Sequence, residues 1–153
     1  MTIDISKVQV IKAELKHFKS VVFIAREDID LLGWLPTTAF KNAIEKGHIL
    51  VAADDKRVYG FVEFGAVTKP KWTIHKIAVI KPARRYGIGG LLIDGLVKLA
   101  AEVGAGVRLK VTEDNENAIK FYQRHGFGLI EVEPSKTRKL WVMETRAETT
   151  NPA

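Results

Sequence analysis

The first third of the chain shows the hydrophobic spacing of helices. Between Leu15 and Leu32, apolar residues recur at the interval that lines one buried face of a helix. The segment 33–47 predicts a second helix, because Pro36 would fall in its first turn and Gly47 just past its end. A short apolar run at 8–13 indicates a strand ahead of both helices.

From residue 48 onward, short strand-like runs alternate with helical patterns. The runs 48–53 and 58–67 flank the polar segment DDKR and predict a hairpin. A third strand, Lys71–Val79, ends before Pro82, and a helical stripe then runs from Ile88 to Val103. The rest of the chain predicts a strand at 107–112, a helix at 115–125 closed by Gly126, and strands at 127–133 and 138–144.

This order of elements predicts a fold of the α/β or α+β class. A mixed sheet would carry about four helices, because strands and helices alternate through the second half of the chain. Residues 1–146 are expected to form a single domain, and residues 147–153, which are polar and terminal, a flexible tail.

The turn between the third strand and the following helix combines basic residues with glycines. Arg84 and Arg85 precede Gly87, Gly89 and Gly90. Glycines let a ligand approach the main chain, and the first amides of a helix attract anions together with the helix dipole. The arginines can add charge-assisted hydrogen bonds to phosphate. The pattern indicates a diphosphate cradle; the alternative is a turn whose glycines only allow tight packing of helix against strand.

Two motifs carry a family resemblance. The turn has neither the Gly-Lys-Ser/Thr of a P-loop nor the dinucleotide-binding fingerprint. The pattern Arg84-x-x-Gly87-x-Gly89 after IAVIKP resembles the acyl-CoA-binding motif of the GCN5-related N-acetyltransferase (GNAT) superfamily. The segment NENAIKFYQRHGF at 115–127 is similar to that family's N-x-x-A-x-x-x-Y-x-x-x-G-F segment, and the two motifs occur in the family's order and separation.

The resemblance implies a mixed sheet with splayed strands and a coenzyme A site. In that family the strand before the turn holds pantetheine and the acyl carbonyl through its backbone, and the turn holds the diphosphate. Carried over to this sequence, the strand positions are Ile77, Ala78 and Val79, and the diphosphate positions are Arg84, Arg85, Tyr86, Gly87, Ile88, Gly89 and Gly90.

Two residues of the second motif have both a functional and a structural interpretation. Asn115 matches the family asparagine that contacts the cofactor, but an asparagine at a helix start also serves as an N-cap. Tyr122 matches the family tyrosine near the cofactor sulfur, where a phenol can protonate the departing thiolate. The alternative for Tyr122 is aromatic packing beside Phe121 and Phe127.

The general base is the most open assignment. Several members of the family place a base on the strand that enters the glycine turn, and His75 is the residue there that titrates near neutrality. Glu63, on the preceding strand among apolar residues, is the rival, because burial would raise the pKa of its carboxyl. A water chain without a dedicated base is the third alternative. Trp34 is a candidate for lining the acceptor cleft.

Composition limits the classes of partner that the protein can have, but it says little about the reaction. The chain of 153 residues has no cysteine, which suits a reducing cytoplasm, and its apolar runs are too short to span a bilayer. His17 and His48 have no partners in a metal-like spacing, so we expect no metal site. A net charge of +6 favours acidic partners, which include phosphorylated cofactors and nucleic acids.

The predicted function is transfer of an acetyl group from acetyl-CoA to an amine by direct attack in a ternary complex. The acceptor stays open among a small-molecule amine, a protein amine and an RNA-linked amine, and a homodimer is a further candidate assembly. The alternative is a non-catalytic module on the same fold that senses acyl-CoA or binds nucleic acid or a partner.

Overall fold

The computed structural model describes residues 2–27 and 36–145. Within these ranges the chain forms four α-helices and a sheet of seven strands in the order β1-β2-β3-β4-β5-β7-β6. This confirms the predicted mixed sheet with about four helices. Trp34 and the predicted tail at 147–153 lie outside the described residues.

The chain divides into two compact units. The first comprises Met1–Gly65 and His75–Leu96, and the second comprises Ala66–Ile74 and Val97–Ala153. Strand β4 and helix α4 each contribute residues to both units. The single domain over residues 1–146 therefore stays a prediction.

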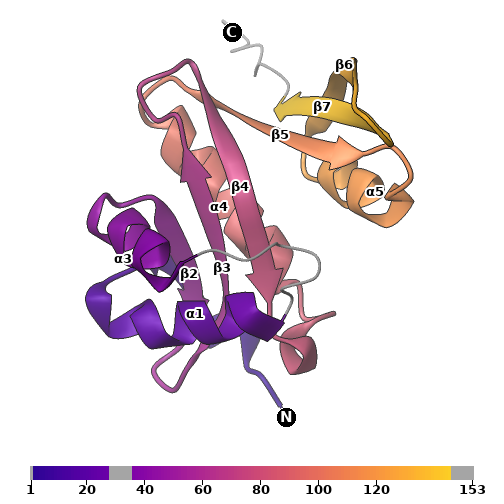
Figure 1. Cartoon of the computed structure of the whole chain (residues 1–153). Coiled ribbons are helices and arrows are strands. Elements are labelled where there is room, and N and C mark those ends of the chain that lie inside the picture. The colour runs from indigo at the N-terminus through magenta and orange to yellow at the C-terminus, as the bar shows by residue number, and fades with distance from the viewer. Residues whose placement is uncertain (1, 28–35, 146–153) are drawn as a thin grey trace, which may run out of the picture. The chain divides into compact units, whose positions relative to one another are not determined.

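The first unit is built on the N-terminal half of the sheet. Strands β1 and β2 pair antiparallel, and so do β2 and β3, as the predicted hairpin requires. Helices α1 and α3 lie on one face of these strands, and α4 begins on the other face (Figure 1). The elements are β1 (Gln9–Lys12), α1 (Phe18–Glu27), α3 (Thr37–Glu45), β2 (Ile49–Ala53), β3 (Val58–Gly65), β4 (Lys71–Val79) and α4 (Ile88–Ala101).

The core of this unit centres on β2 and β3. Every residue of β2 is buried, and the ring of Phe61 on β3 packs edge-on against Phe40 of α3 at a centroid distance of 6.3 Å. On the α4 side, a Cβ atom at Gly60 would lie 2.7 Å from the carbonyl oxygen of Ala78 and 3.2 Å from a methyl group of Leu92. A glycine at this position therefore lets the end of β4 lie close against β3.

The first helix is shorter at its start than the hydrophobic spacing predicts. Residues Leu15–His17 form a 3₁₀ turn, and α1 begins only at Phe18. The ring nitrogen Nδ1 of His17 accepts a hydrogen bond from the amide of Glu14 at 2.9 Å, which stabilises this tighter turn. Apolar periodicity alone cannot distinguish such a turn from a regular helix.

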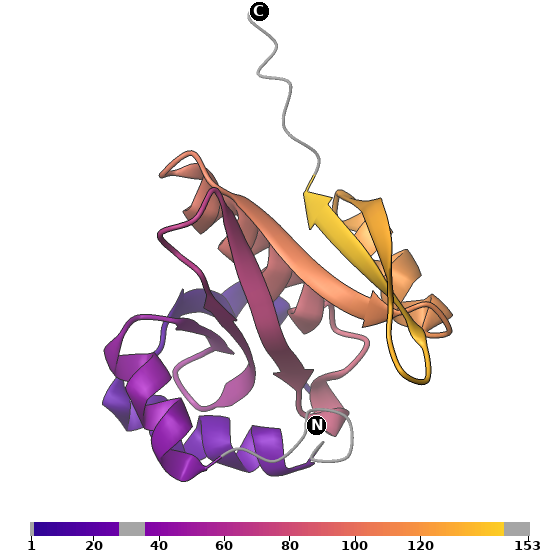
Figure 2. The same cartoon turned by 45° about the horizontal axis from the view of Figure 1, so that its top comes forward.

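The second unit carries the C-terminal strands (Figure 2). Strand β4 pairs in parallel with β5, in a ladder that joins Lys71–Thr73 to Gly106–Arg108. Strands β5 and β7 pair antiparallel, as do β7 and the edge strand β6, whose register shifts between Leu129 and Glu131. The elements are β5 (Gly106–Thr112), α5 (Glu116–Arg124), β6 (Phe127–Pro134) and β7 (Lys139–Thr145).

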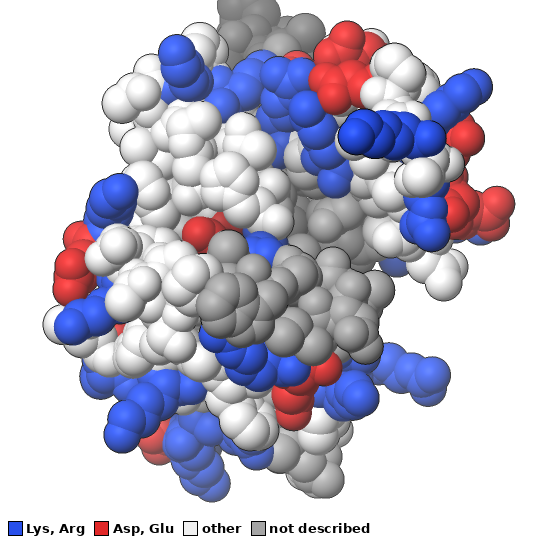
Figure 3. Space-filling model, in the orientation of Figure 1, with Lys and Arg blue, Asp and Glu red and all other residues white. Residues whose placement is uncertain are grey.

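Charged side chains are scattered over the face in Figure 3, between large areas of uncharged residues. Lysines and arginines are more frequent there than the aspartates and glutamates that lie among them. Across residues 2–27 and 36–145, no helix combines the length and the apolar character needed to cross a membrane.

Candidate active site

The glycine turn after β4 has the backbone of an anion-binding loop. A short 3₁₀ turn, Lys81–Ala83, follows β4, and the chain then passes through two left-handed residues, Arg85 with φ 76° and Gly87 with φ 82°. Such alternation turns successive amides toward one side, which is a recurring geometry for binding phosphate. All residues from Arg84 to Gly87 are exposed to solvent.

Helix α4 starts directly from this turn. The amide of Leu91 donates to the carbonyl of Gly87 at 3.1 Å, and this is the first bond of the helical series. The amides of Ile88, Gly89 and Gly90 precede it and therefore have no acceptor within the helix. A Cβ atom at Gly87 would meet no atom within 4 Å, so there is open space beside the residue that precedes these amides.

The two arginines of the motif differ in their local geometry. The Nε of Arg84 donates to the carbonyl oxygen of Val79 at 3.2 Å, so this side chain folds back onto the end of β4. Arg85 holds the left-handed conformation, which costs a residue with a side chain about 1 kcal/mol or more. Sequence reasoning placed both arginines at the site but could not distinguish their roles.

The end of β4 presents alternately buried and open side chains. Trp72, Ile74 and Ala78 are buried, whereas Ile77 and Val79 are only partly buried. The parallel ladder to β5 ends at Thr73, before Ile77, Ala78 and Val79. The ladder to β5 therefore uses only the first three residues of β4, and the splayed strands that the family resemblance implies stay a prediction.

The two rival bases lie near one another, and His48 lies with them. Burial raises the pKa of Glu63, and the charges of His75 and Lys76 oppose that rise. Burial lowers the pKa of His48, as do the charges of Lys46 and His75. The Oε1 atom of Glu63 is buried and accepts no hydrogen bond from the described part of the chain.

Gly65 makes room for His75 in this cluster. A Cβ atom at Gly65 would lie 2.5 Å from the Nε2 of His75, so any other residue would displace the imidazole. Sequence reasoning missed Gly65 and His48. The signal was limited to a glycine two residues after Glu63, which marks a close approach only once the facing strand is known.

The two residues of the second motif belong to the other unit. The Asn115 side chain accepts a hydrogen bond from the amide of Ala118 at 3.3 Å, so it caps α5. Tyr122 packs edge-on against Phe121 and Phe127, with ring centroids 5.2 and 5.7 Å away. Burial raises the pKa of Tyr122. Both structural interpretations are confirmed, and the cofactor roles of the two residues stay predictions.

No set of three or more histidine, cysteine, aspartate or glutamate side chains that could hold a metal occurs within the described ranges.

Comparison with known proteins agrees with these features. The profile of the acetyltransferase (GNAT) family matches residues 11–127. N-alpha-acetyltransferase 50 of Danio rerio is 26% identical over 139 residues, which cover 83% of this chain and 74% of that protein. The structure of Ard1 from Thermoplasma volcanium superposes with a TM-score of 0.76 and 25% identity, over 90% of this chain and 96% of that one.

A second solved structure shares the fold at lower identity. Arabidopsis thaliana Naa50, in complex with the bisubstrate analogue CoA-Ac-MVNAL, superposes with a TM-score of 0.73 and 20% identity, over 92% of this chain and 99% of that one. The family match extends from β1 through the glycine turn to the start of β6 and includes both motifs. The chain therefore belongs to the acetyltransferase (GNAT) family.

Proposed function

We propose that this N-acetyltransferase moves the acetyl group of acetyl-CoA to the α-amino group at the N-terminus of a polypeptide. The observation that carries the acceptor class is the similarity, over 83% of the chain, to an N-alpha-acetyltransferase. The observation that supports the donor is the exposed turn Arg84–Gly87, followed at the start of α4 by amides that have no acceptor within the helix.

Acetyl-CoA would be held by backbone more than by side chains. The amides of Ile88, Gly89 and Gly90 would donate to the diphosphate, and Arg84 and Arg85 would add charge-assisted hydrogen bonds. The remaining turn positions, Tyr86 and Gly87, complete the cradle. The backbone of Ile77, Ala78 and Val79 lies beyond the ladder to β5, so it would be available to pair with pantetheine.

The reaction needs one bond formed, one broken and two protons moved. The neutral amine attacks the thioester carbonyl carbon, and a backbone amide of the β4 segment stabilises the resulting oxyanion. The C–S bond then breaks, and the electron pair leaves with the coenzyme A sulfur. A base removes the proton from the attacking nitrogen, and an acid protonates the thiolate.

Glu63 is the better supported of the two candidate bases. Its side chain is partly buried, its buried Oε1 atom has no hydrogen-bond partner among the described residues, and its raised pKa makes it a stronger base than an exposed carboxylate. His75 precedes Ile77, the first residue of the segment proposed to hold pantetheine, by two residues, or about 7 Å along an extended strand. The proton of the attacking amine would reach Glu63 through His75 or through water.

Substitution of each candidate tests whether Glu63, rather than His75, is the general base. Glu63→Gln should lower kcat at least about tenfold and remove the acidic limb of the pH–rate profile. His75→Gln should give a smaller loss if the histidine only relays the proton. An unchanged profile in both variants would leave a water chain without a dedicated base as the mechanism.

Tyr122 is proposed as the acid, on the basis of the motif. Its raised pKa keeps the phenol protonated at neutral pH, as a proton donor requires. Tyr122→Phe retains the ring that packs against Phe121 and Phe127, so we expect lower kcat with little change in stability. Unaltered turnover in this variant would reject the acid role.

The decisive experiment is an acceptor screen that measures thiol release from acetyl-CoA. One arm contains peptides with free N-termini, and a matched arm contains the same peptides with blocked N-termini and one internal lysine. Further arms contain polyamines and aminoacyl-tRNA. Turnover confined to the free N-termini supports the proposal. Turnover with tRNA alone would favour the RNA-linked acceptor that the net charge of +6 also permits.

Several properties remain predictions beside this function. The cytoplasmic location rests on the absence of cysteine. The homodimer rests on the edge strand β6, which exposes Leu129, Ile130 and Val132.

A further inference from the structure

Tyr59 is an extra residue in the pairing of β3 with β2. Gly60 lies opposite Ala52 on β2. The next pair along the strands joins Val58 to Ala53, so Tyr59 has no partner of its own on β2. Such a β-bulge redirects the groups of the extra residue, and bulges are frequent beside functional sites. The side chain and the main chain of Tyr59 can therefore bond outside the β2–β3 ladder.

The side chain of Tyr59 is fixed by the loop between β2 and β3. The residue is only 4% exposed, and its hydroxyl donates to the carboxylate of Asp54 at 2.5 Å. The same carboxylate accepts from the amides of Lys56 and Arg57 at 2.8 and 3.0 Å. The bond between phenol and carboxylate raises the pKa of Tyr59 to about 12 and lowers the pKa of Asp54. The contact therefore persists throughout the neutral pH range.

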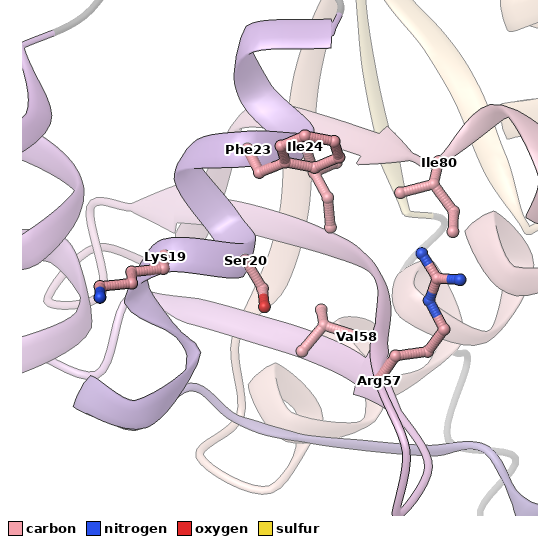
Figure 4. Close-up of a pocket in the computed structure, with 7 residues that line it drawn as sticks. All are labelled: Lys19, Ser20, Phe23, Ile24, Arg57, Val58 and Ile80. Carbon is pink, nitrogen blue, oxygen red and sulfur yellow. The ribbon is translucent and has the colours of Figure 1, made fainter.

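The main-chain carbonyl of Tyr59 bonds to the first residue after β4. It accepts from the amide of Ile80 at 2.9 Å. Val58, which precedes Tyr59, and Ile80 are both buried. They line one pocket of about 320 Å³ together with Arg57 and four residues of α1 (Figure 4). The bond thus joins two segments in buried surroundings, where a lost backbone hydrogen bond is costly.

From Ile80 the hydrogen bonds continue into the glycine turn. The carbonyl of Ile80 accepts from the amide of Ala83 at 3.0 Å, and the carbonyl of Ala83 accepts from the amide of Tyr86 at 3.4 Å. Ala83 itself is fully buried. A continuous series of contacts therefore runs from Asp54 through Tyr59 to the turn that is proposed to hold the diphosphate.

We propose that Tyr59 is a positioning residue for acetyl-CoA, which holds the end of β4 and the start of the glycine turn in the conformation that binds the donor. The inference rests on the proposed donor role of the turn. Tyr59 acts through Ile80 and does not touch the reacting atoms. Its loss would let the turn adopt conformations that do not bind, which weakens donor affinity and leaves the chemical step unchanged.

Tyr59→Phe tests this role, because it removes the hydroxyl and keeps the buried ring. The KM for acetyl-CoA and the Kd of coenzyme A should rise about threefold to tenfold, with little change in kcat or in the KM for the acceptor. Calorimetric titration gives the Kd without any acceptor. In hydrogen exchange, the amide of Ile80 should exchange faster than in the parent protein, whereas that of Val51, in the middle of β2, should change little.

Asp54→Ala should raise the same KM at least as much, and it serves if Tyr59→Phe does not fold. The double variant should raise the KM no further than Asp54→Ala does, because the two residues form one contact. Asp55→Ala is the matched control, since it removes an exposed carboxylate one residue away. Val142→Ala is the control for stability, because it shortens a fully buried side chain of β7 in the other unit. Neither control should change the KM for acetyl-CoA.

Three outcomes would overturn the inference alone. The first is an unchanged Kd of coenzyme A in Tyr59→Phe. The second is an equal increase in Tyr59→Phe and Val142→Ala, because the effect would then follow from general stability. The third is additive losses in Tyr59→Phe and Asp54→Ala, because the two residues would then not act through their shared bond. A parent protein that does not bind coenzyme A would instead reject both the donor role of the turn and this inference.

Discussion

At the scale of single residues, the site depends on backbone conformation as much as on side-chain chemistry. Gly87 is left-handed and open, and Arg85 adopts the same conformation although it has a side chain. Strain of this kind persists only where the surrounding structure imposes it, and it is frequent in ligand-binding turns. The left-handed residues of the turn are therefore held in place by the surrounding fold.

Gly87→Ala should separate local strain from binding. The substitution forces alanine into φ 82°, which should lower the free energy of unfolding by about 1 kcal/mol. It should also raise the KM for acetyl-CoA severalfold, because the turn can relax. Gly104→Ala is the control: Gly104 has φ 75° and equally open space, but lies outside the turn. Equal KM values in the two variants would contradict the role of Gly87.

The partly buried Glu63 carboxyl should make stability depend on pH. Burial raises its pKa, so the native state binds this proton more tightly than the unfolded state does. The stability it contributes is complete below the unfolded pKa and is lost as pH rises through the raised native value. Glu63→Gln should remove this decline above about pH 4 in urea unfolding curves.

The control for this measurement is Glu45→Gln, which removes an exposed carboxylate of α3. A decline of the same size in Glu63→Gln as in the parent protein would mean that another group titrates.

At the scale of elements, the position of the end of β4 depends on its packing against β3 and α4. Gly60 on β3 admits the carbonyl of Ala78 and the side chain of Leu92, so strand and helix approach closely where the pantetheine is proposed to lie. The position of the Ile77–Val79 backbone therefore depends on Gly60, a residue that has no side chain.

Gly60→Ala should disturb both the fold and the donor site. The new methyl group would lie 2.7 Å from a backbone oxygen, which cannot move like a side chain, so we expect a loss of about 1–3 kcal/mol in unfolding free energy and a higher KM for acetyl-CoA. Gly95→Ala is the control, because its nearest contact, at 2.8 Å, is the side chain of Val10, and alanine favours the helix. A larger destabilisation by Gly95→Ala would contradict this account.

At the scale of the whole molecule, the net positive charge governs the long-range attraction of anionic ligands. The chain carries +6 and a pI near 9.5, while its lysines and arginines are interspersed with acidic residues on the face in Figure 3. Such a distribution attracts anions over long distances without defining one docking patch.

The affinity for acetyl-CoA should therefore depend on salt. Raising the ionic strength from about 0.05 M to about 0.5 M should increase the KM for acetyl-CoA severalfold and change kcat little, because screening weakens attraction to the phosphates. Arg84→Gln with Arg85→Gln should reduce this dependence, and the control Lys136→Gln, on the loop between β6 and β7, should not. A salt-independent KM would mean that the backbone amides bind the diphosphate without help from charge.

Much of the fold, and the position of the turn proposed to bind the donor, could be predicted from the sequence. Strand β4 has the predicted bounds, and α4 starts at the predicted Ile88, because Pro82 and the glycines break the chain at definite positions. The GNAT family and its enzyme class are confirmed, because the two motifs combine residues of fixed type at fixed spacing. The sequence is sufficient to predict a feature when residues that are neighbours along the chain form it.

Other features depend on contacts that no pattern in the sequence marks. The 3₁₀ turn before α1 needs the hydrogen bond between Glu14 and His17, which apolar spacing does not encode. The pocket at Arg57 needs α1, β3 and Ile80 together, and no motif marks it.

The sequence by itself determined the order of the elements, the place of the glycine turn and the family, because turns, caps and glycines act on their own neighbours along the chain. Only the tertiary structure decided which carboxyl is buried, which glycine admits which neighbour and where a pocket forms. Burial raises the pKa of Glu63, and this burial results from the packing of β3 against other elements. It cannot be predicted from the sequence of β3 alone.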